Sequence, residues 1–188
     1  MAKKERIPIP EEIGTFIKEQ CTVVRAMFTE EKEVQPMLIL LTRFEGELEV
    51  GMAPLMGPWM DSPDAKDMIR AIIIPKIKEA LKEMKKELVC ICFISEAWAW
   101  NGTKEDMERV NGDHKKLPKK EVIIMSFDFN EGNKTIFYEI KRKMEVNEQG
   151  LNEVIELGFE SMNKESEDDL TLDPDAKMGG RMSNLFHA

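Results

Sequence analysis

The sequence has few residues of the kinds used as nucleophiles and bases: two histidines and three cysteines among 188 residues. Nucleophilic catalysis by serine or cysteine needs an imidazole held firmly beside the nucleophile. His114 lies in a charged segment and His187 is the penultimate residue, so we expect both to be solvated. The chain also lacks the Gly-x-x-x-x-Gly-Lys and Gly-x-Gly-x-x-Gly patterns. No motif therefore favours nucleotide binding, and no residue pattern calls for a cofactor.

The cysteines do not suggest disulfides or a metal centre. An odd number without framework spacing is typical of proteins from a reducing cytosol. Cys90 and Cys92 lie two residues apart in a predicted strand, so both side chains point to one face. A zinc site there would need a further histidine or a second cysteine pair nearby, and neither is present. We predict buried free thiols and no metal site.

Long apolar runs and an excess of positive charge are also missing. The longest apolar runs, Pro36–Thr42 and Leu88–Ser95, are far shorter than the roughly 20 residues that span a bilayer. The first residues, Met1–Arg6, are charged and no apolar segment follows them, so we expect no signal peptide and a cytoplasmic protein. With 36 acidic against 27 basic residues, the net charge of −9 disfavours direct binding to nucleic acid.

The length and the 42% of hydrophobic residues predict one domain with a core of its own. We place this domain at residues 1–160. From Ser161 onward the chain holds six acidic and three basic residues and few apolar ones. Residues 161–188 are therefore predicted to form an acidic, flexible C-terminal tail.

Apolar spacing and turn residues predict the helices and strands of an α+β domain. The expected sheet is five-stranded and mixed, with two β-hairpins and one central strand. An N-terminal helix, a crossover helix that is kinked at Pro75 or divided there into two abutting helices, and a short C-terminal helix are expected to pack on it. The ranges are a helix over Pro10–Phe28, strands over Met37–Phe44 and Glu47–Ala53, a helix from Asp61 or Ser62 to about Lys86, a central strand over Leu88–Ser95, strands over Glu121–Phe129 and about Lys134–Lys143, and a helix over about Leu151–Met162.

The first hairpin carries a defined register. A turn at Glu45-Gly46 pairs Phe44 with Glu47, which places Leu48, Val50 and Met52 on one face with the apolar residues of the preceding strand. We expect that shared face to be buried. In the second hairpin, a turn at Glu131-Gly132 pairs Asn130 with Asn133 and places Asp128 opposite Thr135.

Three carboxylates and a lysine form the only candidate catalytic set. Asp128, Glu139 and Lys141 have the Asp…Glu-x-Lys spacing of metal-dependent nucleases, whose chemistry needs two carboxylates on one divalent ion and a lysine beside the attacking water. Glu96 is a third candidate acid. The expected register separates Asp128 and Glu139 by about 13 Å, too far to share an ion easily.

The most unusual segment is Ser95-Glu96-Ala97-Trp98-Ala99-Trp100, at the end of the central strand. Ligands tend to bind outside the carboxyl ends of strands in sheets with crossover helices, and tryptophan is a frequent anchor in protein interfaces. Ser95, Glu96, Trp98 and Trp100 are therefore candidate binding residues. The alternative is that the two tryptophans continue the strand and cap the core.

The same segment resembles a widespread group of small phage and bacterial proteins. The resemblance rests on a strand ending in Ser95-Glu96-Ala97-Trp98, a polar loop and the strand Glu121–Ser126. The tail fragment Gly180–Phe186 is similar to a Gly-Arg-aromatic C-terminus in that group, although Met182 stands where the group has the aromatic residue. The group brings no known activity with it.

These observations favour a non-enzymatic accessory protein of phage or bacterial origin that binds another protein, with self-association as a further option. The acidic tail ending in Leu185-Phe186, together with Arg181, is expected to dock on a basic groove with an apolar pocket. The alternative is a metal-dependent hydrolase or nuclease that uses Glu96, Asp128 and Glu139. A third option is mimicry of DNA, which would require acidic residues spaced like phosphates on one face.

Overall fold

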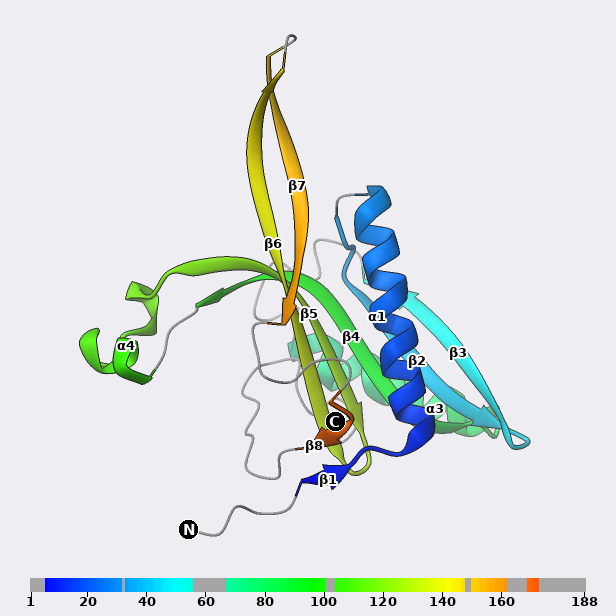
Figure 1. The fold of residues 1–188 in the computed structure, drawn as a ribbon. Helices are drawn as coiled ribbons and strands as arrows, with labels where there is room; N and C mark the ends of the chain where they lie inside the picture. Colours follow the sequence, from blue (N-terminus) through cyan, green and yellow to red (C-terminus); the bar gives the residue numbers. More distant parts are fainter. Residues whose placement is uncertain are drawn as a thin grey trace.

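A computed structural model describes residues 6–31, 33–55, 67–100, 104–147, 150–161 and 169–172 (Figure 1). For residues 142–147 and 150–161 the description covers the backbone alone. The elements in chain order are β1 (Ile7–Pro8), α1 (Glu11–Glu31), β2 (Met37–Phe44), β3 (Glu47–Pro54), the π-helical turn η2 (Ile69–Ile73), α3 (Ile74–Glu83), β4 (Glu87–Trp100), α4 (Lys104–Arg109), the 3-10 turn η3 (His114–Lys116), β5 (Lys119–Phe129), β6 (Gly132–Asn147), β7 (Gly150–Ser161) and β8 (Thr171–Leu172).

The predicted α+β class is confirmed, but the sheet differs from the expected one. It has six strands in the order β3-β2-β4-β5-β6-β7, and every neighbouring pair is antiparallel. The expected mixed, five-stranded sheet is therefore wrong. The strands joined by the crossover, β3 and β4, do run parallel, since both are antiparallel to β2. They are not neighbours, because the hairpin places β2 between them.

The sixth strand replaces the predicted C-terminal helix. Residues Gly150–Ser161 form β7, which pairs with β6 along its length. Figure 1 shows these two strands projecting together as a long ribbon beyond the rest of the sheet. The spacing of apolar residues here fits a strand as well as a helix, since Leu151, Ile155, Leu157 and Phe159 also recur with a period of two. Pairing with the long β6 decides in favour of the strand.

The predicted kink at Pro75 is not confirmed. Pro75 lies in the first turn of α3, directly after η2, where the Ile74 N–H donates to the carbonyl of Ile69, five residues earlier. A proline lacks the N–H for a helical hydrogen bond, and its ring crowds the carbonyl four residues back. The wider π turn accommodates both effects.

Helix α1 and the first hairpin agree with the sequence analysis. The buried face of α1 consists of the predicted stripe and two additional residues, Gly14 and Gln20; the stripe residues are Ile13, Phe16, Ile17, Cys21, Val24 and Phe28. The β2–β3 register pairs Phe44 with Glu47, as predicted. Glu45 and Gly46 have φ of 51° and 90°, the left-handed conformation that a tight hairpin turn requires.

The second hairpin is shifted by two residues from its predicted register. Phe129 pairs with Gly132, so the turn consists of Asn130 and Glu131. Gly132 has φ of 156°, and a Cβ there would lie 3.0 Å from Leu172 Cδ1. Glycine is therefore needed as the first residue of β6, where the C-terminal segment packs closely, and not as the second turn residue.

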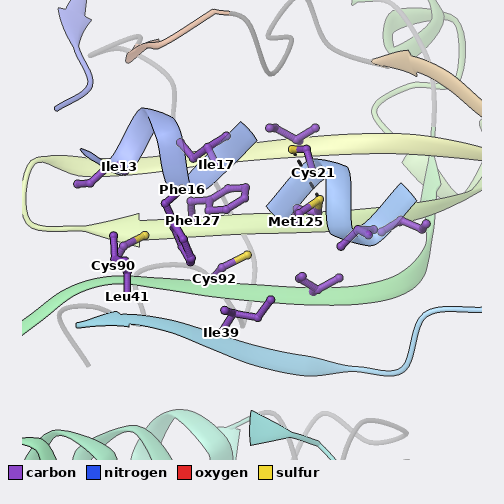
Figure 2. Packing of buried hydrophobic residues seen from close by; sticks show 14 of the residues in the cluster. Ile13, Phe16, Ile17, Cys21, Ile39, Leu41, Cys90, Cys92, Met125 and Phe127 are labelled. Atoms are coloured by element: carbon purple, nitrogen blue, oxygen red, sulfur yellow. Dashed lines mark hydrogen bonds between the residues drawn. The ribbon is translucent and has the colours of Figure 1, made fainter. Parts of the chain in front are cut away.

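The core lies on both faces of the sheet. On one face, α1 packs over residues of β2, β4, β5 and β6, and Phe16 meets Phe127 edge-to-face with ring centroids 6.1 Å apart (Figure 2). On the other face, Leu38, Ile91 and Phe93 pack against Ile69 and Ile74. Each face of β4 is thus covered, which confirms the prediction of a central, buried strand.

Part of the expected tail lies against the domain. Strand β8 pairs with β1, and Leu170 packs so close to α1 that a Cβ on Gly14 would lie 2.9 Å from Leu170 Cδ1. Arg6 forms an ion pair with Asp169. The predicted tail therefore contains four residues, 169–172, that dock on the fold, and the apolar Leu170 and Leu172 are the reason. None of the helices in the described ranges is long and apolar enough to cross a bilayer.

Candidate binding surface

The three candidate carboxylates lie apart. Asp128 is 1% exposed and opposite Asn133, whereas Glu139 is opposite Val122. Asn133 and Glu139 are six residues apart on β6, so about 20 Å separates the two carboxylates along the strand. The slipped register thus increases the separation that the sequence predicted. The Glu139 carboxylate accepts a hydrogen bond from Lys120 at 2.7 Å, and Lys141 is exposed.

Glu96 lies on the other face of the sheet. Side chains alternate along β4, and Cys90, Cys92 and Ile94 belong to the cluster under α1, so Glu96 also faces the α1 side. Its Oε1 accepts the backbone N–H of Val34 at 2.7 Å, in the segment that follows α1. Glu96 therefore holds the connection between α1 and β2. The geometry gives Glu96, Asp128 and Glu139 no common ion, and the described residues contain no group of three potential metal-binding acids, histidines and cysteines.

The cysteines are buried free thiols, as predicted. Cys21, Cys90 and Cys92 all lie in the core beneath α1, with Cys21 Sγ 4.0 Å from Met125 Sδ (Figure 2). Burial raises the pKa of the Cys90 thiol well above its ordinary value, and the charge of Asp128 raises it further. Burial likewise raises the pKa of the Cys92 thiol, so Cys90 and Cys92 are protonated at neutral pH. All three cysteines serve the packing of the core.

Near the end of β4, Trp98 is presented to solvent. Trp98 is 61% exposed and opposite Glu121, so it does not cap the core. Ser95 is buried and donates a hydrogen bond to the carbonyl of Glu96 at 2.7 Å, so Trp98 is the most exposed member of the predicted set among the described side chains. The side chain of Trp100 lies outside the described residues, as do Arg181, Leu185 and Phe186.

A larger apolar surface lies between α1 and β3. Leu48, Val50 and Met52 on β3 are 43%, 52% and 68% exposed, and Val23 on α1 is 41% exposed. A groove of about 630 Å³ runs between the helix and the strand. We call it the α1–β3 groove; its lining residues are Lys18, Glu19, Gln20, Thr22, Val23, Val50 and Met52.

The groove exists because the cover that α1 gives to the sheet ends before β3, the outermost strand. The buried cluster under α1 includes Ile39 and Leu41 of β2 and no residue of β3. The predicted burial of Leu48, Val50 and Met52 is therefore wrong, although their register with β2 is right.

The apolar face of β3 can be recognised in the sequence, but its exposure cannot. Glu47 and Glu49 alternate with the apolar residues of β3, and Gly51 adds no side chain to the polar face. That alternation fits a covered strand and an uncovered one equally well.

Comparison with known proteins returns no counterpart: no family model, curated protein or solved structure matches this chain. The similarity of the Ser95–Trp98 segment to small phage and bacterial proteins therefore stays a prediction. The arrangement of side chains described above supplies the argument about function.

Proposed function

We propose that the protein acts by binding another protein, and that the α1–β3 groove receives an apolar segment of that partner. The observation that carries the proposal is the clustering of exposed apolar side chains there. Val23, Leu48, Val50 and Met52 are each more than 40% exposed and lie on two adjoining elements. Single exposed apolar residues are common, but contiguous ones mark interaction sites.

The chemistry of the groove indicates the kind of segment that fits it. Val50 and Met52 line its strand side, and Val23 lines its helix side together with the polar residues Lys18, Glu19, Gln20 and Thr22. Methionine adapts its shape to different apolar ligands. An apolar helix or extended segment with polar flanks would bury its side chains on Val50 and Met52. A contact of this size supports affinities in the micromolar range, about 1–100 µM.

The resemblance supports the biological setting of the proposal. It suggests an accessory protein of phage or bacterial origin that works in the cytoplasm. The partner segment is expected to be supplied by a protein of the same cell. The second hypothesis, a metal-dependent hydrolase using Glu96, Asp128 and Glu139, has no support from the positions of the three carboxylates.

Selection of peptides from a random display library on the full-length protein tests the proposal. Val50→Lys places a charge in the groove, and Met84→Lys is a matched control because Met84, at 51%, is as exposed as Val50 but follows α3. We expect the selected peptides to be apolar, to bind Val50→Lys at least tenfold more weakly and to bind Met84→Lys unchanged. Failure to select any peptide, or equal binding to Val50→Lys, would overturn the proposal.

A further inference from the structure

Strand β3 has an edge that is free to pair with another strand. Its eight residues pair with β2 on one side, and no strand within the described ranges lies on the other. The β2–β3 register runs without a shift, whereas β2–β4 shifts between Leu41 and Thr42. Proteins guard edge strands with bulges, charged side chains, especially lysines, and prolines. Glu47–Pro54 contains no lysine and has its proline at the last residue, so Glu47 and Glu49 are the charges that a second strand must accommodate.

We propose that two copies of this protein dimerise by pairing their β3 strands edge to edge, antiparallel about a two-fold axis at Val50. A two-fold axis perpendicular to the sheet keeps the α1 side of both copies on the same face. Directly opposite residues must then share a face, which restricts the axis to registers centred on a residue. The proposal goes beyond partner binding, because it rests on the backbone edge and on the face away from the groove.

The side chains of β3 select the register centred on Val50. This register places Glu49 opposite Gly51, Glu47 opposite Ala53 and Leu48 opposite Met52 of the other copy. Centring on Glu49 would set two glutamates directly opposite each other, which is destabilising. Centring on Gly51 would bring Pro54 into the paired region opposite Leu48. The Val50 register pairs residues 47–53 with no like charges opposed.

The charges beside the axis also suit self-pairing. Lys86 forms an ion pair with Glu49 and lies 5.7 Å from the centre of the Phe44 ring. In the Val50 register the two copies of Glu49 are diagonal neighbours, about 7–8 Å apart. The two Lys86 ammonium groups neutralise them on the face opposite the groove. A Cβ on Gly51 would meet nothing within 4 Å, so this position leaves room for Glu49 and Lys86 of the other copy.

Dimerisation would join the two sheets into one and bring the two grooves together. Leu48, Val50 and Met52 of both copies would form one apolar floor bordered by an α1 helix on each side. The partner segment of the proposed function would then meet a surface twice as wide as the one that a single copy offers.

Sedimentation velocity of the full chain and charge reversal at Gly51 test the dimer. Gly51 has open space and no left-handed φ, so a side chain is accommodated in the single copy. Gly51→Glu places a glutamate directly opposite Glu49 of the other copy, and the two-fold axis gives two such pairs in each dimer. The dissociation constant of the dimer should therefore rise about fivefold to thirtyfold, whereas Gly51→Lys should lower it. Ala71→Glu and Ala71→Lys make the same changes in net charge at an exposed site on η2 and should leave the dimer unchanged.

Cross-linking tests the register. Val50→Cys should form an intermolecular disulfide in the presence of diamide, because opposed residues of antiparallel strands lie within disulfide range. Lys82→Cys, exposed on α3, should not. The native cysteines are buried and do not interfere. A wild-type protein that stays monomeric up to about 100 µM, a dimer that ignores the charge at residue 51, or no Val50→Cys cross-link would overturn the inference.

Different experimental outcomes would overturn the dimer and the proposed binding function. The residue-51 side chain lies on the face away from the groove, so Gly51→Glu should still bind the peptides selected on the wild type. A monomeric wild-type protein that binds peptides would overturn the dimer alone. A dimer that binds no peptide would overturn the proposed function alone.

Discussion

The extent to which α1 covers the sheet can be measured by comparing truncations at two cross-strand neighbours. Ile39 and Met52 are directly opposite on β2 and β3, but Ile39 is 1% exposed and Met52 is 68% exposed. Truncation of either residue to alanine removes three side-chain heavy atoms. At about 0.8 kcal/mol per buried group, Ile39→Ala loses about 2.4 kcal/mol of transfer free energy, and the cavity brings the cost to about 2–5 kcal/mol. For Met52→Ala, only about a third of that transfer free energy applies and no cavity forms, so the cost is about 0.8 kcal/mol or less.

Urea unfolding followed by circular dichroism measures both values. The protein concentration should be low enough to keep copies of the chain apart, so that the free energy of unfolding is that of one copy. The dependence of this free energy on urea concentration should be the same for wild type and both variants. A cost above about 2 kcal/mol for Met52→Ala would mean that β3 is covered in the single copy, contrary to the exposure of Met52.

Three further predictions concern single side chains. Glu96→Ala should destabilise the fold by about 1–2 kcal/mol by removing the acceptor for the backbone N–H after α1, and Glu96→Gln by less, as measured by urea unfolding. Cys90 should react with a thiol reagent at pH 8 only when denaturant is added, because burial raises its pKa and excludes the reagent. The hydrogen bond from Thr171, and then that from Arg6, holds the pKa of Asp169 below its ordinary value. Asp169→Asn should therefore lower stability at neutral pH, and the difference from wild type should fade as the pH drops below about 3.9, the unfolded value, through the folded pKa.

Local patterns predicted the elements whose partners are close in the sequence. The stripe of α1 and the register of the first hairpin follow from side-chain period and from the left-handed turn at Glu45-Gly46. The buried strand β4 follows from its apolar residues on both faces. In these elements, the spacing of apolar and turn residues determines the backbone conformation without help from distant parts of the chain.

The remaining errors come from partners that are distant in the sequence. The segment 150–161 fits a helix and a strand alike until β6 provides a long edge for it. The position of Gly132 is explained by Leu172, forty residues later. Burial of β3 depends on where α1 lies, which the strand itself does not encode.

The same contrast between local patterns and distant partners applies to the candidate functional residues. Spacing alone brought Asp128, Glu139 and Lys141 together as a motif, but the two carboxylates lie about 20 Å apart along the sheet. The sequence left Trp98 either as a binding residue or as a cap on the core, and its exposure excludes the cap. The α1–β3 groove could not be predicted from either element, because it forms where a helix ends its cover of the sheet.

Methyl chemical-shift mapping of a selected peptide on the full-length protein locates the binding site directly. We expect the perturbed methyl groups to be those of Val23, Leu48, Val50 and Met52, on the two elements that border the groove. We also expect Met84 and the Trp98 indole to stay unperturbed. Perturbations centred on Trp98, or spread without preference over the surface, would contradict the assignment of the α1–β3 groove as the binding site.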